Sequence, residues 1–223
     1  MLDAILALRE RLNDTTRIAI ELNTSCPNIP SSPAPAYDFP SLMPFLTILS
    51  EYYKRDTTLT IGLKLPPYVY ASQFDAVIQH VSSFSFSHGG DVLNPFAFFT
   101  STNTLGSCLL FVDQSTSALQ EGPSSIFAVP TVLGGLGGES IHALSLGNVY
   151  TLTRLLENAA DEALRRIVVI GVGGVTTPEA VGRMLKAGAK VVGCATIFGR
   201  EGVAAFEKLS AGLEDPDGLS KRH

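Results

Sequence analysis

The feature of this sequence that most restricts its fold is a regular alternation of short apolar runs with longer stretches of helical periodicity. Five runs of strand length, bounded by Gly, Pro, Asn or Ser, lie at residues 17–23, 58–64, 96–103, 167–170 and 190–195. Stretches with apolar residues at three- and four-residue spacing lie at residues 40–54, 72–81, 140–156, 177–187 and 202–213. This alternation predicts an α/β fold, a parallel sheet covered by helices.

The positions of the glycines distinguish between two parallel α/β folds. A dinucleotide-binding fold carries its Gly-rich turn after the first strand. Here the corresponding turns follow late strands, at residues 171–174 and at Ala195-Thr196, where a (β/α)8 barrel binds phosphate. Five strands are fewer than the eight of a closed barrel. We therefore predict a (β/α)8 TIM barrel that lacks about three strand-helix units.

The segment 109–138 is too long for an ordinary connection between a strand and a helix. Its two short apolar runs, at residues 109–112 and 126–129, predict an inserted β-hairpin that ends in the GGLGG turn at residues 134–138. No repeat or low-complexity linker divides the chain, so residues 1–223 are expected to form a single domain. The opening residues 1–12 are amphipathic; Asp3 and Glu10 favour a helix over a mitochondrial presequence.

Composition excludes several classes of partner. The chain has 16 Lys and Arg against 21 Asp and Glu, a net charge of −5, which argues against nucleic acid. No apolar run approaches the roughly 20 residues of a membrane span. Cys26, Cys108 and Cys194 form no CxxC pair, which indicates a reducing compartment and fits the cytoplasm. The 4 histidines show no metal-ligand spacing, so no metal site is expected.

The densest polar cluster, ELNTSCPNIP, follows the first predicted strand. Catalytic groups of a barrel lie at this end of its strands. Asn23 and Asn28 flank Cys26, and amides both donate to and accept from a planar ligand that carries carbonyl and NH groups. Cys26 is a candidate general base or nucleophile. The alternatives are a small buried thiol beside a proline and asparagines that only form turns.

Lys64 lies inside an apolar strand, TIGLKLP. An unpaired ammonium group is costly to bury, so the pattern predicts an anionic or carbonyl partner for this side chain. The alternative is a lysine at the end of a strand that extends into solvent.

Several motifs occur together in the order found in dihydroorotate dehydrogenases. They are Asn23-Thr24-Ser25-Cys26-Pro27-Asn28 with Pro30, Gly62-Leu63-Lys64-Leu65-Pro66-Pro67-Tyr68, Asn103-Thr104, Gly134-Gly135-Leu136-Gly137-Gly138, Gly173-Gly174, and Ala195-Thr196 with Glu201-Gly202. The chain therefore resembles this family from about residue 17 to residue 209. By this resemblance the strand-helix units that it lacks are the first three of the family barrel, an N-terminal truncation. It looks most like the cytosolic, fumarate-linked class, which has Cys at the position where the quinone-linked class has Ser.

The resemblance implies FMN-dependent oxidation of dihydroorotate to orotate in de novo pyrimidine (UMP) biosynthesis, with fumarate as electron acceptor and a cytoplasmic homodimer as the assembly. It makes Cys26 the base that removes a proton from C5 of the substrate. The residues implied in substrate binding are Asn23, Asn28, Asn103 and Thr104, and those implied in FMN binding are Lys64, Gly137, Gly173, Gly174, Ala195 and Thr196.

The sequence departs from the family pattern at three places. Thr104 stands where Ser is common, and Ala195 replaces a Gly, which requires a negative φ or strain there. Ser107-Cys108 replaces Asn-Gly, which puts the local turn in doubt. Two alternatives stay open: a truncated, catalytically inactive remnant of the family, and a related dihydropyrimidine dehydrogenase, which shares the NxSCPN motif but whose iron-sulfur cysteine spacing is missing here.

Overall fold

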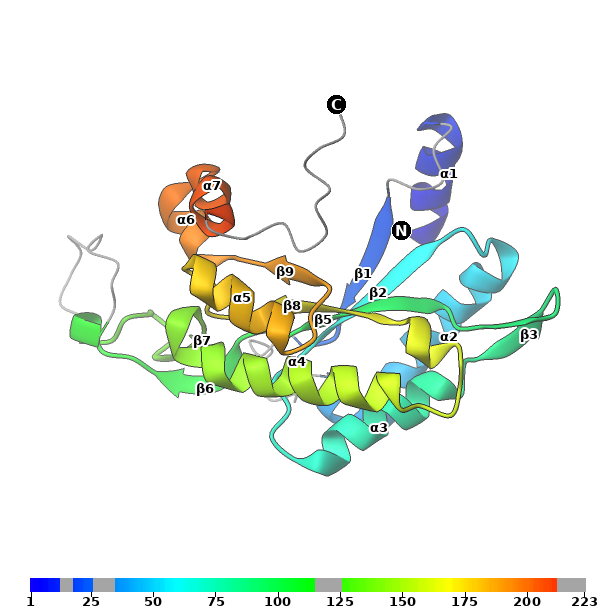
Figure 1. Cartoon of the computed structure of the whole chain (residues 1–223), viewed down its shortest axis with the longest axis horizontal. Coiled ribbons are helices and arrows are strands. Elements are labelled where there is room, and N and C mark those ends of the chain that lie inside the picture. The colour runs from blue at the N-terminus through cyan, green and yellow to red at the C-terminus, as the bar shows by residue number, and fades with distance from the viewer. Residues whose placement is uncertain (13–17, 26–34, 115–125, 212–223) are drawn as a thin grey trace.

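Five parallel strands form the central sheet, in the order β1-β2-β5-β8-β9 (Figure 1). The computed structural model describes residues 1–12, 18–25, 35–114 and 126–211. The strands of the sheet are β1 (Ala19–Asn23), β2 (Thr60–Leu65), β5 (Phe96–Ser101), β8 (Val168–Val172) and β9 (Val191–Gly193). Each of the five overlaps one of the predicted apolar runs, which are rich in β-branched and aromatic residues.

The order of the strands in the sheet is their order along the chain. Every crossover adds its strand to the same edge, so right-handed crossovers place the helices on one face of the sheet. A dinucleotide-binding fold reverses its strand order at a switch point, and this sheet does not. Within the described residues β1 and β9 each pair with one neighbour. The α/β fold with a parallel central sheet is confirmed, and the described strands do not close into a barrel.

The helices lie where the periodicity predicts them, with one addition. They are α1 (Leu2–Leu12), α2 (Phe39–Arg55), α3 (Ala71–Ser82), α4 (His142–Glu157), α5 (Pro178–Lys186), α6 (Thr196–Glu201) and α7 (Ala204–Ser210). The predicted helix at 202–213 corresponds to α7, and its last two residues lie outside the described part of the chain. The additional helix is α6, whose six residues are too short for a periodic apolar pattern.

The core lies between the sheet and its helices. Ile61, Leu63 and Leu65 of β2 are completely buried, as are Leu46 of α2 and Leu152 of α4. The side chains that alternate with them in the sheet point to the other face, so Lys64 and Phe98 are only half-buried. The sheet therefore has one face inside the core and one face that no described helix covers.

A small antiparallel hairpin precedes β5 at the amino end of the sheet. It joins β3 (Phe86–His88) to β4 (Asp91–Leu93) and was not predicted from the sequence. Gly89 and Gly90 form its two-residue turn with φ values of 61° and 95°. Two consecutive positive φ angles are characteristic of the turns that join tight hairpins, and glycine adopts them without steric cost.

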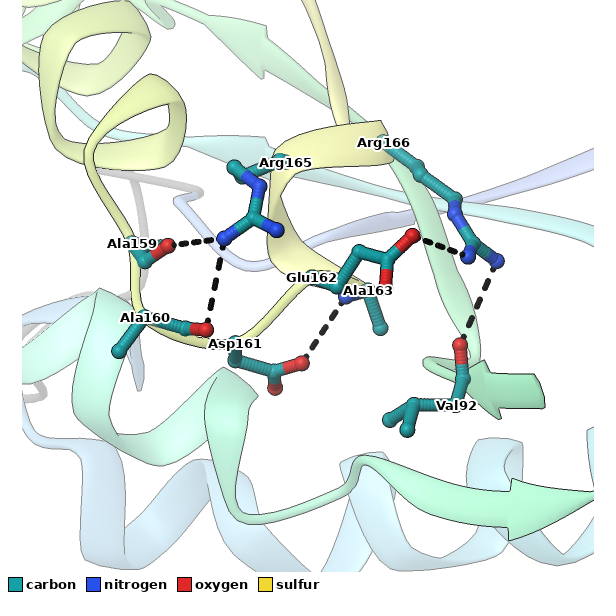
Figure 2. Close-up of polar contacts among 8 residues, drawn as sticks. All are labelled: Val92, Ala159, Ala160, Asp161, Glu162, Ala163, Arg165 and Arg166. Carbon is teal, nitrogen blue, oxygen red and sulfur yellow. Dashed lines mark hydrogen bonds and ion pairs between the residues drawn. The ribbon is translucent and has the colours of Figure 1, made fainter. Parts of the chain in front are cut away.

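One polar contact joins this hairpin to the connection between α4 and β8, which includes η4 (Leu164–Arg166), and others order the connection itself, as Figure 2 shows. The guanidinium of Arg166 donates to Glu162 at 3.0 Å and to the carbonyl oxygen of Val92 at 3.4 Å. Arg165 donates to the carbonyl oxygen of Ala159 at 2.7 Å. These contacts lie at the end of the sheet opposite to the strand carboxyl ends, where barrel residues serve stability rather than catalysis.

A second antiparallel pair, β6 (Leu105–Leu109) with β7 (Leu133–Leu136), projects from the other end of the sheet (Figure 1). The GGLGG segment was predicted as a turn, and this is wrong for its first three residues, which belong to β7 and pair with β6. The segments 109–112 and 126–129 also lie together, since Ala128 N–H donates to the carbonyl oxygen of Leu110 at 2.9 Å. Residues 115–125 between them lie outside the described part of the chain.

Replacing Leu152 by Ala tests the position of the core. Leu152 is completely buried, so the substitution is expected to lower the free energy of unfolding by about 2–5 kcal/mol in urea denaturation. Leu185 of α5 is 41% exposed, and Leu185→Ala is the matched control, with an expected change within about 0.5 kcal/mol. Equal losses in the two variants would contradict the assigned packing of α4.

Candidate functional site

One cavity lies at the carboxyl ends of β2, β5, β8 and β9. It has a volume of about 110 Å³. Its walls come from the end of β2, the loops that follow β5, β8 and β9, and the segment that begins η3 (Gly138–Ile141). Parallel strands bring their carboxyl ends to one edge of the sheet, which is why residues more than 130 positions apart in the sequence, such as Lys64 and Thr196, line the same space.

This cavity brings together most of the residues singled out in the sequence. Its lining includes all six residues implied in FMN binding and two of those implied in substrate binding: Lys64, Gly137, Gly173, Gly174, Ala195, Thr196, Asn103 and Thr104. Asn23 lies beside it, hydrogen-bonded to Asn103. Cys26 and Asn28 lie outside the described residues.

A network of amide and hydroxyl groups joins the loop after β1 to the loop after β5. The side-chain nitrogen of Asn103 donates to Ser25 Oγ at 2.9 Å and to the Ser25 carbonyl oxygen at 3.1 Å. Ser25 Oγ in turn lies 3.1 Å from Asn23 Oδ1 and donates to it. Thr24 and Ser25 are 1% exposed. The residue before Cys26 is therefore held firmly between the two loops.

Lys64 is half-buried and lines the cavity from the end of β2. Its backbone is anchored, because its carbonyl oxygen accepts a hydrogen bond from Thr24 Oγ1 at 2.7 Å. Within the described residues no carboxylate forms an ion pair with its ammonium group. The anionic or carbonyl partner predicted for Lys64 is thus not supplied by this part of the chain.

Asn148 of α4 fixes the loop that follows β2. Its Oδ1 accepts from the backbone N–H of Tyr68 at 2.7 Å, and its Nδ2 donates to the carbonyl oxygen of Tyr68 at 3.0 Å. Asn148 and Tyr68 are both buried. Burial raises the pKa of the Tyr68 phenol, and the phenol O–H donates a hydrogen bond to the carbonyl oxygen of Ala36 at 3.2 Å. The loop that follows β2 and Lys64 is therefore attached to a neutral, hydrogen-bonded interior.

The turn after β8 requires glycine at two positions. Gly173 and Gly174 have φ values of 132° and 66°. A Cβ at Gly173 would lie 2.0 Å from Ser145 Oγ, and one at Gly174 would lie 2.6 Å from His142 Cβ. The turn therefore lies directly against the first residues of α4, at a distance that no side chain permits.

The turn after β9 has a different geometry. Ala195 has a φ of −127°, so its replacement of a glycine causes no left-handed strain. Within the described residues, no group accepts a hydrogen bond from the N–H of Gly174, Ala195 or Thr196. Unpaired backbone N–H groups in adjacent turns at the edge of a cavity form an arrangement that binds anions.

Sequence reasoning missed several residues of the cavity. Thr102, Ile141, Val175, Thr176 and Cys194 also line it. Burial raises the pKa of the Cys194 thiol, so this cysteine stays protonated near neutral pH. For Thr102 the available signal was its place directly after a strand, although such residues often serve only as turn formers.

Ser107 shows how the altered turn in β6 is built. It has a φ of 60°, in the left-handed region where Asn and Gly are more common. The pairing of β6 with β7 shifts register between Leu105 and Cys108. The strand therefore accommodates Ser at this position through an irregularity in its pairing.

Two kinds of feature are absent from the described residues. No group of three or more His, Cys, Asp or Glu side chains there is arranged to hold a metal ion. Likewise, none of the helices in the described ranges combines the length and apolar character that crossing a bilayer requires.

Replacing Gly174 by Ala tests the packing of the turn. The new Cβ would meet His142 and the Gly138 carbonyl oxygen, 2.9 Å away, at a left-handed φ that itself costs about 1–2 kcal/mol. We expect a lower free energy of unfolding. Gly182 of α5 has open space around it, so Gly182→Ala is the control and should gain about 0.5–1 kcal/mol. A neutral Gly174→Ala variant in urea denaturation would contradict this geometry.

Comparison with known proteins gives the family. A profile of the family described as dihydroorotate dehydrogenase matches residues 3–216. A dihydroorotate dehydrogenase (fumarate) from Saccharomyces mikatae is 31% identical over 216 residues, which cover 96% of this chain and 60% of the relative. The Saccharomyces cerevisiae protein of the same name gives the same values, 31%, 96% and 60%. The relative from Kluyveromyces lactis is 30% identical over 95% of this chain and 59% of its own length.

The chain thus spans about 60% of the length of the curated relatives it matches. The match extends over nearly all of its residues, and on this basis the chain belongs to the dihydroorotate dehydrogenase family.

Proposed function

We propose that this chain forms the FMN-binding and catalytic part of an enzyme that oxidises dihydroorotate to orotate, with fumarate as the electron acceptor. The observation that carries the proposal is the cavity at the strand carboxyl ends. Eight residues implied by the family motifs line it, although they come from five separate segments of the chain. Names of relatives that include fumarate support the choice of acceptor.

The residues of the cavity fit a phosphate and a polar ring. The N–H groups of Gly174, Ala195 and Thr196 have no described partner and would hold the FMN phosphate. The volume of about 110 Å³ is smaller than the roughly 300–1,000 Å³ of whole ligand pockets. The described part of the site would therefore contact part of the cofactor, and the remaining contacts would come from outside the described residues.

Bound FMN would supply a hydride acceptor, a capacity that no side chain has. The substrate loses a proton from C5 and a hydride from C6 when its ring becomes unsaturated. Cys26 would take the C5 proton, since it follows the anchored Ser25 directly. Asn23 and Asn103 would hold the carbonyl and N–H groups of the ring, and their mutual hydrogen bond at 3.3 Å sets the spacing of the two amides.

Lys64 would contact the flavin ring. Lys64 lines the cavity, and its ammonium group has no carboxylate partner in the described residues. A positive charge close to the ring favours the electron-rich reduced flavin over the oxidised form. The same charge makes the site more favourable for an anionic substrate such as dihydroorotate.

The open sheet supports a further part of the proposal. β1 and β9 each leave one edge unpaired within the described residues, and exposed edges and an uncovered sheet face are unfavourable in a stable protein. We propose that the active form is a (β/α)8 barrel in which about three more strand-helix units join β1 to β9. By its resemblance to the cytosolic, fumarate-linked class, the active form would also be a cytoplasmic homodimer.

The open sheet also favours a second candidate, a catalytically inactive remnant of the family. In that case the 223-residue chain alone would neither bind flavin nor react with dihydroorotate. Titration of the purified chain with FMN separates the two: flavin that is retained and then bleached by dihydroorotate supports the enzyme. A protein that stays colourless after FMN is added supports the remnant.

Replacing Cys26 by Ala tests the proposed base. We expect the variant to retain FMN while flavin reduction by dihydroorotate falls by about 10²–10⁴-fold, the usual contribution of a general base. Stopped-flow absorbance of the flavin provides the measurement. Cys108→Ala is the matched control, because Cys108 lies in β6 and does not line the cavity. Full activity of the Cys26→Ala variant would remove this thiol from the mechanism.

Replacing Lys64 by Met tests the charge beside the ring. Met keeps much of the apolar volume and removes the ammonium group, so the reduction potential of bound FMN is expected to become more negative. FMN affinity is expected to fall by about tenfold, the loss of one charge-assisted contact. Spectroelectrochemical titration measures the potential and a fluorescence titration with FMN measures the affinity. Lys186→Met in α5, at an exposed position, is the control. An unchanged potential would contradict a contact with the ring.

A further inference from the structure

We infer that His142 is a positioning residue for the phosphate site, because it holds the Gly173–Gly174 peptide in one orientation. The inference rests on the proposed function, since it concerns how the cavity binds the FMN phosphate. His142 is the first residue of α4 and has ring nitrogens that contact two different segments. Gly173 belongs to the family motifs, whereas His142 and Arg183 do not.

The two contacts define the protonation of the ring. Nε2 lies 3.1 Å from Nε of Arg183, and Nδ1 lies 2.8 Å from the carbonyl oxygen of Gly173. A guanidinium group can only donate, so Nε2 of His142 must accept. The carbonyl oxygen of Gly173 can only accept, so Nδ1 must carry the proton. The arrangement therefore requires the neutral Nδ1–H tautomer, with Arg183 fixing that choice.

The orientation of the peptide follows from its planarity. The Gly173–Gly174 bond is trans, so the Gly173 carbonyl and the Gly174 N–H point in opposite directions. When His142 holds the carbonyl toward α4, the N–H of Gly174 points away from the helix. No described group accepts a hydrogen bond from this N–H, and Gly174 lines the cavity.

Two glycines on either side of one peptide make this restraint necessary. Both residues have positive φ, and glycine permits the peptide between them to rotate with little steric cost. A rotated peptide would present a carbonyl oxygen where an N–H is needed, and this would repel a phosphate. A second contact restrains the same loop, since Thr176 Oγ1 donates to Glu139 Oε1 at 2.7 Å, but it does not act on this peptide.

The test compares binding of FMN and riboflavin, which share the ring and differ in the phosphate, to the full chain. His142→Ala is expected to weaken FMN binding by about tenfold, the loss of one oriented hydrogen bond. Riboflavin affinity should change by less than about twofold, because the ring contacts are kept. His142→Asn should restore much of the FMN affinity, since the Asn amide can donate from nearly the position of Nδ1. His88→Ala, at an exposed histidine of the β3–β4 hairpin, is the control.

Equal losses for both flavins in His142→Ala would mean a general structural role and would overturn the inference. Retention of the FMN preference in His142→Ala would overturn it as well, and both results leave the proposed function intact. A wild-type chain that binds neither flavin would contradict the proposed function, and the inferred role would fall with it. Thermal melting of each variant shows whether it is folded.

Arg183 provides an independent check. If Arg183 acts through His142, Arg183→Ala should weaken FMN binding when it is introduced into the wild-type chain. It should have no further effect in the His142→Ala background. A full additional loss in that background would mean that Arg183 contacts the phosphate itself, and it would overturn this assignment. Imidazole ¹⁵N resonances report the tautomer without any flavin. The Nδ1–H form is expected near neutral pH, and an Nε2–H form would contradict the hydrogen-bond assignment.

Discussion

The parallel pairing of the five strands in chain order is the constraint on which the rest of this structure depends. It places every strand carboxyl end at one edge of the sheet and every crossover helix on one face. The polar residues after β1, β2, β5, β8 and β9 therefore meet, although each belongs to a different segment. With an antiparallel arrangement half of these residues would lie at the opposite edge, and the cavity would not exist.

Much of this could be predicted from the sequence, and what could not has a physical reason. The strands of the central sheet are rich in β-branched and aromatic residues and are bounded by Gly, Pro, Asn or Ser, so all five were found. The β3–β4 hairpin has strands of three residues, too short for a pattern to be recognised, although Gly89-Gly90 signals its turn. The GGLGG segment was misassigned because glycine favours turns, whereas pairing with β6 holds its first part in a strand. Cys26 and Asn28 stay predictions, since they lie outside the described residues.

The face of the sheet that no described helix covers carries polar residues on its first strands and apolar residues on its last ones. Asn23, Lys64 and Thr100 lie side by side in register across β1, β2 and β5, and Thr100 donates a hydrogen bond to Glu21. Ile170 and Val191 continue the same row on β8 and β9. A polar ligand is therefore favoured over the first strands of the sheet, and an apolar surface over the last ones.

Helix α4 holds three loops of the site from successive turns. His142 binds the Gly173 carbonyl, Ser145 Oγ lies 2.9 Å from Thr102 Oγ1, and Asn148 holds the backbone of Tyr68. These three side chains occupy roughly 9 Å of helix, yet they reach the loops after β8, β5 and β2. The helix therefore fixes the relative positions of these three loops. If it slid or tilted slightly, the loops after β8, β5 and β2 would shift together, so their mutual spacing is preserved or lost as a unit.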